Sequence, residues 1–202
     1  MNTKDVLIIG AGAAGSSTAF HLAKAGHKVT VVEKQSSATE IKACGGGMAA
    51  SVQQLFPFDM SPVIDDVINK VEFTWCLNDL VVANLPGSSP FWIVRREMLD
   101  RFLINQACLE GAELLQPLSV KKVERDKKFW QITCSNGQQL ESRALVIADG
   151  SNSPWPEKFG LGPKKQKYAV TTSVRLKGHG TLKKGTARFE FGLVHHGFAW
   201  AF

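Results

Sequence analysis

Three glycines near the start of the chain have the spacing needed to hold a nucleotide phosphate. Gly10, Gly12 and Gly15 follow the β-favouring apolar run 6–9 and open an alanine-rich segment. At a strand-to-helix junction, such glycines permit a tight turn, close approach of a pyrophosphate and packing of the helix on the strand. The helix N-terminus adds N–H donors and a positive dipole end. The pattern therefore predicts a phosphate-binding loop.

Glu33 strengthens this prediction because it ends a second apolar run, residues 28–33. A carboxylate at that position can accept hydrogen bonds from the hydroxyl groups of an adenosine ribose. It favours an unphosphorylated 2′ hydroxyl, and so FAD or NAD over NADP. The alternative, a glycine turn that binds nothing, explains the loop but not the carboxylate placed after it.

The elements that must position these residues follow from periodicity and turn residues. Residues 6–33 predict a strand, a helix over 14–25 closed by Gly26, and a second strand, which is the layout of a βαβ nucleotide-binding unit. Residues 96–110 predict a helix with one apolar face, stopped by Gly111. Its apolar face is formed by Leu99, Phe102, Leu103 and Ala107.

Short β-favouring segments occupy much of the remaining chain. Residues 118–124, 129–134 and 139–141 predict a three-stranded antiparallel meander with a hairpin at Asn136-Gly137, and 144–148 predict a separate buried strand. Residues 71–85 predict further antiparallel strands. The fold class expected from these segments is α/β, a Rossmann-like nucleotide-binding domain with this meander, together with a further antiparallel sheet.

Composition sets the broad class and the compartment. The four cysteines lie far apart without a CxxC pair, which argues against a zinc site and a disulfide framework, and we expect no metal. No apolar run reaches the roughly 18 residues of a spanning helix, and the first residues lack a basic secretory leader. We therefore expect a cytoplasmic protein.

The net charge of +6 comes largely from lysine doublets such as Lys121-Lys122 and Lys183-Lys184, dispersed along the chain. Dispersed lysines indicate a solvated surface. No nucleic-acid-binding module accompanies them, so we expect no nucleic-acid partner. Peripheral contact with anionic lipid headgroups stays open.

Three stretches of the chain are distinctive: Lys42-Ala43-Cys44-Gly45-Gly46-Gly47; Arg96-x-x-Leu99-Asp100-x-x-Leu103 with Gly111-Ala112; and Ala148-Asp149-Gly150-x-x-Ser153. With the order of the predicted elements, they give the chain a resemblance to the glutathione-reductase-type flavoprotein fold, here a Rossmann-like FAD-binding domain with the meander plus part of an antiparallel-sheet substrate domain. Within that fold the chain resembles the geranylgeranyl reductase family, flavoenzymes that saturate prenyl double bonds. The second and third stretches also occur in aromatic-ring hydroxylases. The cysteine-glycine loop alone points toward the reductases.

The resemblance implies FAD as cofactor, NAD(P)H as electron donor and an isoprenoid or other apolar substrate. For the ADP part of FAD, it implies that the pyrophosphate lies on the loop of Gly10, Ala11, Gly12, Ala13, Ala14 and Gly15, the ribose at Glu33 with Lys34 beside it, and the adenine at the backbone near Val120. Arg96 would contact the phosphate or ribityl side of the flavin, and Asp149 and Gly150 would approach the ribityl and pyrophosphate region. The isoalloxazine ring would lie beside Cys44, Gly45, Gly46 and Gly47.

Cys44 is the candidate catalytic residue. The hypothesis is that its thiol faces the flavin and donates the proton when a hydride reaches the prenyl double bond. The alternative is an ordinary buried thiol, since free cysteine is among the most buried residue types. The adjacent glycines need no side-chain role, because they contribute room.

The resemblance also implies a domain division. Residues 1–55 and 92–165 would form the FAD-binding domain, and 56–91 and 166–202 part of a substrate-binding domain. Two departures from the family pattern stand out. Ser153 is followed by Pro154-Trp155-Pro156 where the family has an arginine. The chain also ends in the aromatic run 197–202, before the family's later Gly-Asp flavin motif, and we therefore expect a fragment of a longer protein.

Two other functions remain open. One is an aromatic-ring hydroxylase-type flavin monooxygenase. The other is a truncated, non-catalytic FAD-binding remnant. The sequence leaves the oligomeric state, the exact substrate and the choice between NADH and NADPH undecided.

Overall fold

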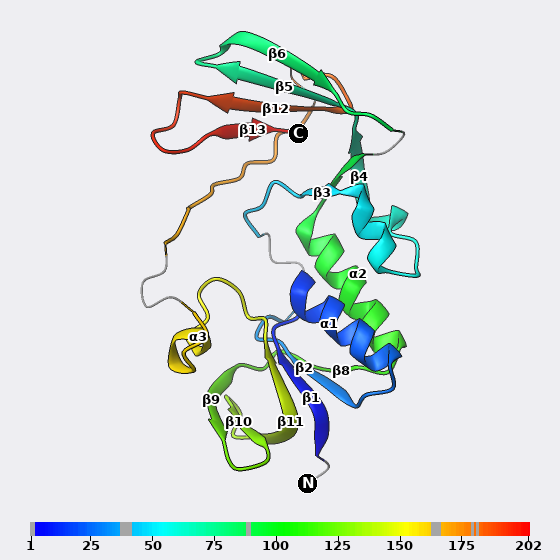
Figure 1. Ribbon diagram of the computed structural model, residues 1–202, viewed down its shortest axis with the longest axis vertical. Helices are drawn as coiled ribbons and strands as arrows, with labels where there is room; N and C mark the ends of the chain where they lie inside the picture. The colour runs from blue at the N-terminus through cyan, green and yellow to red at the C-terminus, as the bar shows by residue number, and fades with distance from the viewer. Residues whose placement is uncertain (1–2, 37–41, 88–89, 163–166, 179, 181) are drawn as a thin grey trace. The chain divides into compact units, whose positions relative to one another are not determined.

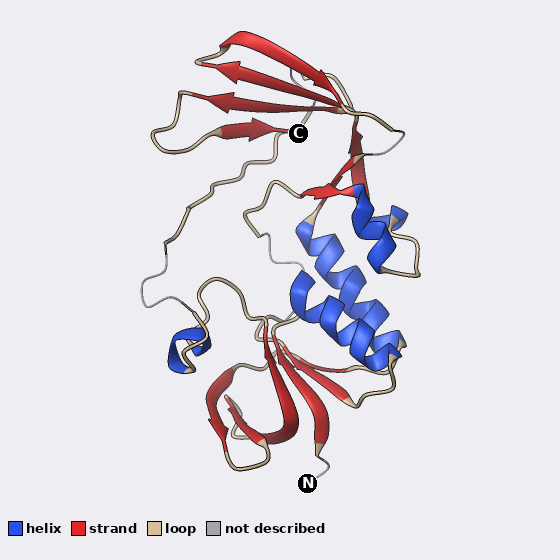
Figure 2. Cartoon of the chain, viewed as in Figure 1, coloured by secondary structure: helices blue, strands red, loops and turns tan. Residues whose placement is uncertain are grey.

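The computed structural model describes residues 3–36, 42–87, 90–162, 167–178, 180 and 182–202. The chain forms two compact units, Met1–Ile41 with Glu97–Ala169 (unit 1) and Lys42–Arg96 with Val170–Phe202 (unit 2). Their helices and strands are coloured in Figure 2. The two units are defined by how their residues pack, and the predicted boundaries of the FAD-binding and substrate-binding domains stay a prediction. The expected boundary at 165–166 lies outside the described residues.

Unit 1 is built on a six-stranded sheet with the strand order β8-β2-β1-β11-β10-β9 (Figure 1). Its strands are β1 Lys4–Ile9, β2 Val29–Val32, β8 Glu113–Leu115, β9 Val120–Arg125, β10 Trp130–Cys134 and β11 Gln139–Ile147. The first four strands in this order pair in parallel, and β11, β10 and β9 pair antiparallel. The α/β class and the antiparallel meander are thereby confirmed.

Strand β1 lies between β2 and β11, which explains its continuous apolar sequence. Its central residues Leu7 and Ile8 are fully buried, as expected for a parallel strand covered on both sides. Because β1, β2 and β11 run in parallel, their carboxyl ends meet at one edge of the sheet. The segments that follow these strands begin with Gly10, Glu33 and Ala148, so the fold gathers the predicted nucleotide-binding residues at this edge.

Strand β11 corrects one prediction. Residues 139–141 and 144–148, expected as two strands, belong to a single strand ending at Ile147. At Ser142 this strand pairs antiparallel with Trp130 of β10 and in parallel with Lys4 of β1. One strand therefore both closes the meander and enters the parallel sheet, and the buried Ser142 marks the junction.

Helix α1 (Ala13–Lys24) packs on β1 and β2. It ends as predicted, because Gly26 adopts φ +86 and donates its N–H to the Ala23 carbonyl while His27 donates to Leu22. This pair of bonds is a Schellman cap, which requires a residue tolerant of the left-handed conformation.

Helix α2 (Arg96–Leu109) also follows the prediction closely. It buries Leu99, Leu103 and Ala107, but Phe102 is only half-buried and the buried face continues through Asp100 and Ile104 instead. A short helix, α3 (Trp155–Lys158), completes the helices of unit 1. No helix among the described residues is long and apolar enough to cross a membrane.

Unit 2 contains two sheets. The four-stranded sheet has the order β13-β12-β5-β6, and the three-stranded sheet has the order β3-β7-β4. Their strands are β3 Gly47–Ala49, β4 Ile64–Ile68, β5 Lys70–Trp75, β6 Asn78–Asn84, β7 Phe91–Val94, β12 Thr186–Phe191 and β13 Ala199–Ala201, with 3-10 helices η1 Ala50–Leu55 and η2 Ser61–Val63. The predicted antiparallel pairing over 71–85 is confirmed by β5 and β6, whereas β12 joins β5 in parallel.

Candidate functional site

The glycine-rich loop of unit 1 shows two different uses of glycine. A Cβ on Gly10 would lie 2.4 Å from the Ala148 carbonyl oxygen, and one on Gly15 would lie 1.9 Å from the Gly10 carbonyl oxygen. Both positions are closed by the protein's own backbone. Gly12 differs, because a Cβ there would meet no atom of the described residues within 4 Å. Its bare backbone therefore leaves open space at the start of α1.

The N-terminus of α1 suits an anion. Gly12 is the N-cap and supplies no side-chain cap, and the first turn, which includes Ala13 and Ala14, carries no acidic residue. The first intrahelical bond shown runs from the Ser16 N–H to the Gly12 carbonyl at 2.9 Å. The N–H groups of a helix's first turn have no intrahelical acceptors, and the helix dipole favours negative charge beside them. This end of α1 has the donors that a pyrophosphate requires.

Glu33 is held directly against the glycine loop. Its Oε2 accepts a hydrogen bond of 2.7 Å from the Ala11 N–H, and its Oε1 accepts one of 2.9 Å from the Gln35 N–H. Each carboxylate oxygen can accept a further hydrogen bond. The carboxylate is therefore fixed in place with acceptor capacity left for hydroxyl groups. Lys34 beside it is exposed.

Asp149 contains a buried polar atom whose partner is absent. Its Oδ1 is buried and has no hydrogen-bond partner among the described residues. Burying a carboxylate oxygen without a donor is costly, so a bound group that donates to it would relieve the cost. The Asp149 Cα lies 2.9 Å from the place of a Cβ on Gly10, so this atom belongs to the same sheet edge as the glycine loop.

Gly150 and Val120 complete the predicted residues of unit 1. Gly150 adopts φ +95, and its carbonyl accepts the Ser153 N–H at 3.1 Å, which forms the turn after β11. Val120 begins β9 and packs on the hydrophobic cluster that contains Ile9 and Val32. The predicted nucleotide-binding residues of unit 1 thus share one sheet edge and the core beneath it.

These features fit the ADP part of FAD. The uncapped N-terminus of α1 suits a pyrophosphate, and the fixed carboxylate of Glu33 after β2 suits ribose hydroxyls. The buried Asp149 Oδ1, which no donor among the described residues reaches, suits a further hydroxyl donor.

The remaining predicted residues lie in unit 2, where Cys44 and Arg96 come close together. The Cys44 Sγ accepts a hydrogen bond of 3.4 Å from the Gly46 N–H and lies 3.9 Å from the Arg96 Nη1. Cys44 is exposed, so the ordinary buried-thiol interpretation does not apply. The structure thus places N–H donors beside the sulfur, an arrangement that supports a reactive thiol.

Close packing within unit 2 leaves no space for a side chain at positions 45, 46 and 47. A Cβ on Gly45 would lie 2.5 Å from the Trp200 Nε1, one on Gly46 would lie 1.9 Å from the Val94 carbonyl oxygen, and one on Gly47 would lie 2.6 Å from the Phe91 Cζ. On these sides the chain's own backbone and rings fill the space beside the glycines, and the expected room for the isoalloxazine ring stays a prediction. Sequence reasoning missed this role of Trp200, whose signal was the alternation of aromatic residues at 198, 200 and 202.

The four-stranded sheet turns an aromatic face outward. By register, Phe73 lies beside Phe189, and Phe189 opposite Trp200, which puts all three on one face. Adjacent rings contact one another, with centroids 5.8 Å apart for Phe73 and Phe189. We call this the aromatic face; it consists of Phe73, Trp75, Phe189, Phe191, Phe198, Trp200 and Phe202. Trp75 and Phe198 remain 59% and 45% exposed.

The opposite face of the same sheet is polar and internally satisfied. Glu72 accepts hydrogen bonds from the Arg188 Nε and Nη2 at 2.9 and 2.6 Å and pairs with Lys70 at 2.8 Å. These cations lower the pKa of the Glu72 carboxyl, Lys70 contributing most. Glu190 accepts hydrogen bonds from the Thr74 hydroxyl and the Leu77 N–H. The aromatic face is therefore the one with unused binding capacity.

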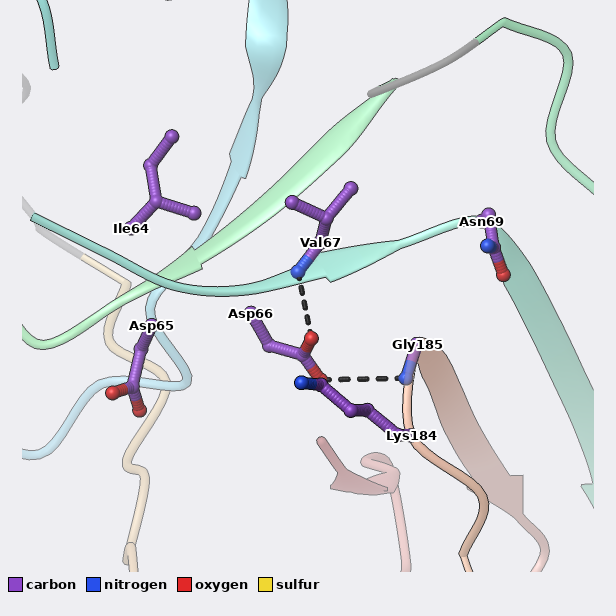
Figure 3. Close-up of a pocket in the computed structure, with 7 residues that line it drawn as sticks. All are labelled: Ile64, Asp65, Asp66, Val67, Asn69, Lys184 and Gly185. Carbon is purple, nitrogen blue, oxygen red and sulfur yellow. Dashed lines mark hydrogen bonds between the residues drawn. The ribbon is translucent and has the colours of Figure 1, made fainter. Parts of the chain in front are cut away.

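A separate hollow of about 510 Å³ lies elsewhere in unit 2. Figure 3 shows its lining, with Asp66 bonded to the N–H groups of Val67 and Gly185 and Lys184 nearby. It contains none of the predicted site residues; Asp66 holds the local backbone, and Asp65 pairs with the Arg95 guanidinium. No group of three or more His, Cys, Asp or Glu side chains in the described part of the chain is arranged to hold a metal ion.

Comparison with known families supports the flavin assignment. Residues 5–63 match the model of the FAD dependent oxidoreductase family. This stretch contains the glycine loop, Glu33 and the Cys44 loop.

Similar curated proteins extend over nearly the whole chain. FixC of Escherichia coli (strain K12) is 30% identical over 181 residues, which cover 85% of this chain and 42% of FixC. The digeranylgeranylglycerophospholipid reductase of Methanocaldococcus jannaschii is 25% identical over 212 residues, which cover 98% of this chain and 52% of the reductase. The chain spans about half the length of the curated relatives it matches.

Solved structures share the fold. A geranylgeranyl bacteriochlorophyll reductase-like protein from Thermoplasma acidophilum superimposes with a TM-score of 0.75 at 20% identity, covering 98% of this chain and 53% of that protein. The halogenase PltM, solved with phloroglucinol and FAD, gives a TM-score of 0.64 at 20% identity, covering 78% of this chain and 36% of that protein. The expected Rossmann-like flavoprotein fold is confirmed.

Proposed function

We propose that this chain, which carries the nucleotide-binding segment of the FAD-dependent oxidoreductases, serves an enzyme that reduces carbon–carbon double bonds of a geranylgeranyl or other prenyl group, with NAD(P)H as electron donor. The observation that carries the proposal is the contact between the Cys44 loop and the aromatic face within unit 2, where Gly45 lies against Trp200. A thiol with adjacent N–H donors beside an apolar surface suits proton delivery to an apolar molecule.

The cofactor would be held largely by unit 1. The N-terminus of α1 and the bare Gly12 would bind the pyrophosphate, Glu33 the ribose, and Asp149 a hydroxyl donor. Arg96 supplies a fixed positive charge for a phosphate or ribityl oxygen. When bound, the flavin supplies hydride transfer, and the protein's part is to bind, orient and protonate.

An isoprenoid substrate is supported by the chemistry of the aromatic face. Its rings offer apolar surface without formal charge, and the cations Lys70 and Arg188 lie on the other side of the sheet, where both pair with Glu72. A prenyl chain has no hydrogen-bonding groups, so burial against rings is the interaction through which a protein recognises it. Such a chain is carried by membrane lipids or pigments, which fits peripheral contact with a membrane and gives no role to nucleic acid.

Cys44 is the proton donor in this proposal. Saturation of a double bond adds a hydride to one carbon and a proton to the other. The thiol hydrogen of Cys44 passes to the second carbon, its S–H bond breaks, and the thiolate recovers a proton from water. The Gly46 N–H and the Arg96 guanidinium lie where they stabilise the sulfur's negative charge in between.

The first test is flavin binding by the purified 202-residue chain. Bound FAD gives an absorbance band near about 450 nm, and we expect this band to remain after gel filtration. A colourless folded chain would contradict FAD binding by this polypeptide, and with it both the reductase proposal and the FAD-binding remnant, and would favour a fragment that needs further residues of a longer protein.

The second test addresses the reaction. With FAD-loaded protein and NADH or NADPH, a geranylgeranyl lipid should gain two hydrogens per double bond, detected by mass spectrometry. Cys44→Ser should reduce this turnover while the flavin band persists, and Cys76→Ser, an exposed thiol on another turn, is the matched control. Equal turnover in the wild type and Cys44→Ser would exclude the assigned role.

An aromatic-ring hydroxylase-type monooxygenase is the second candidate. It is favoured by the shared fold with the FAD-bound halogenase PltM. Oxygen consumption coupled to NAD(P)H oxidation separates the two functions, because reduction of a double bond consumes no oxygen. Stoichiometric oxygen uptake with a hydroxylated product would replace the reductase proposal.

A further inference from the structure

The contact between β13 and the cysteine-glycine loop assigns a role to a residue outside that loop. The Trp200 indole lies against Gly45: its Nε1 and Cε2 are 2.5 and 3.1 Å from the point where a Cβ on Gly45 would be. The ring of Phe202 approaches the same point at 2.9 Å. Gly45 is therefore in van der Waals contact with β13, and its backbone position depends on the ring that covers it.

The other side of the loop is held by β7. The Val94 N–H donates to the Gly46 carbonyl at 2.9 Å, and Gly47 of β3 pairs with Ile93. The loop is thus enclosed by hydrogen bonds to β7 on one side and by the Trp200 ring on the other. Cys44 depends on this arrangement, because its sulfur accepts the N–H of Gly46, the residue at the centre of the loop.

We propose that Trp200 is a positioning residue for the Cys44 thiol, acting through Gly45. Trp200 also belongs to the aromatic face, so a molecule that displaces its ring moves the loop and the sulfur with it. This inference rests on the proposed function only for the chemical role of Cys44. The positioning itself requires neither flavin nor substrate.

The test measures how fast Cys44 reacts in the 202-residue chain. Iodoacetamide labelling of each cysteine is followed by peptide mass spectrometry, with Cys108 of α2, also exposed, as the internal reference. Trp200→Leu removes the Nε1 and Cε2 atoms that cover Gly45. We expect labelling of Cys44 relative to Cys108 to fall about threefold or more, because the sulfur loses the Gly46 N–H that stabilises its negative charge.

A matched substitution separates this effect from a general loosening of the sheet. Trp75→Leu makes the same change on the same aromatic face, on strand β5. Trp75 is not among the nearest neighbours of Gly45, Gly46 or Gly47. Its Cys44 labelling should equal that of the wild type. An unchanged or higher ratio in Trp200→Leu, or an equal fall in both variants, would overturn the proposal.

Crossed double variants identify the contact independently of labelling. Gly45→Ala should lower the melting temperature, and Trp200→Leu should restore part of the loss, whereas Phe91→Leu should not. Gly47→Ala should show the reverse pattern, since its added Cβ would lie 2.6 Å from the Phe91 Cζ. Rescue of Gly45→Ala by both second substitutions would contradict a specific Trp200–Gly45 contact.

The outcomes also separate this inference from the reductase proposal. If prenyl reduction fails while the labelling pattern holds, Trp200 positions the thiol in a protein of another activity. If reduction occurs but labelling is the same in the Trp200→Leu and Trp75→Leu variants, the function stands and the positioning role is wrong.

Discussion

The carboxylate of Glu33 accepts a 2.7 Å hydrogen bond from the backbone N–H of Ala11, so the end of β2 is tied to the glycine loop that follows β1. A second bond from the Gln35 N–H fixes the other oxygen. The acidic residue thus has a structural role in addition to its predicted contact with a ribose. The two roles give separable predictions.

Glu33→Ala should lower both stability and FAD affinity. Removing the carboxylate leaves the Ala11 and Gln35 N–H groups without their acceptor, which costs about 1–3 kcal/mol of unfolding free energy where they are buried from water. Urea unfolding and a fluorescence titration with FAD measure the two effects. Glu124→Gln, an exposed residue of the meander, should change neither, and a normal FAD affinity in Glu33→Ala would exclude the ribose contact.

Gly12→Ala and Gly15→Ala should differ in which property they damage. At Gly15 the added Cβ would lie 1.9 Å from the Gly10 carbonyl oxygen, and overpacking of this kind costs about 1–3 kcal/mol or more of stability. At Gly12 there is space and φ is −71°, so folding should change by at most about 1 kcal/mol. The methyl group there obstructs a pyrophosphate, and we expect the FAD dissociation constant to rise about tenfold or more. Thermal melts and FAD titration of both variants check this, and equal FAD affinity in Gly12→Ala and the wild type would contradict the phosphate site.

Asp149→Ala should stabilise the flavin-free protein or leave its stability unchanged, yet weaken FAD binding. The reason is that Asp149 Oδ1 is buried and no donor among the described residues reaches it, and removing an unsatisfied polar atom relieves its desolvation cost. Melting temperatures measured with and without FAD give both quantities. A large loss of stability without FAD would show that Asp149 has a structural partner instead.

Acid should weaken unit 2 through Glu72. The cations Lys70 and Arg188 lower the pKa of this carboxyl in the folded protein, so its contribution to stability is present above the unfolded value of about 4.3 and is lost as the pH falls through the lower folded value. Melting temperatures at pH 7, 5 and 3.5 should therefore fall more steeply in the wild type than in Glu72→Gln. Glu124→Gln, which changes an exposed ion pair, should retain the wild-type slope. Parallel curves for all three proteins would rule out this contribution.

Much of unit 1 was predictable because its signals are local. The strand, glycine turn, helix and strand over residues 4–32 follow from apolar runs and turn residues that are close in sequence, and Gly26 caps α1 as its type and position indicated. The meander strands were predictable for the same reason. The junction at Ser142 was not, because it arises from simultaneous pairing with Lys4 and Trp130, and period-two patterns do not say which strands become neighbours.

The amino-acid sequence by itself therefore determined the nucleotide-binding class, through glycine spacing, an acidic residue after β2 and the order of the elements. Only the tertiary structure decided which groups hydrogen-bond to these residues or pack against them. Within the part of the chain that the structure describes, it left Asp149 Oδ1 without a donor, tied Glu33 to Ala11, and brought Trp200 against Gly45 from 155 positions along the chain. Such contacts depend on how distant strands pack, and the spacing of residues along one strand or helix carries no information about them.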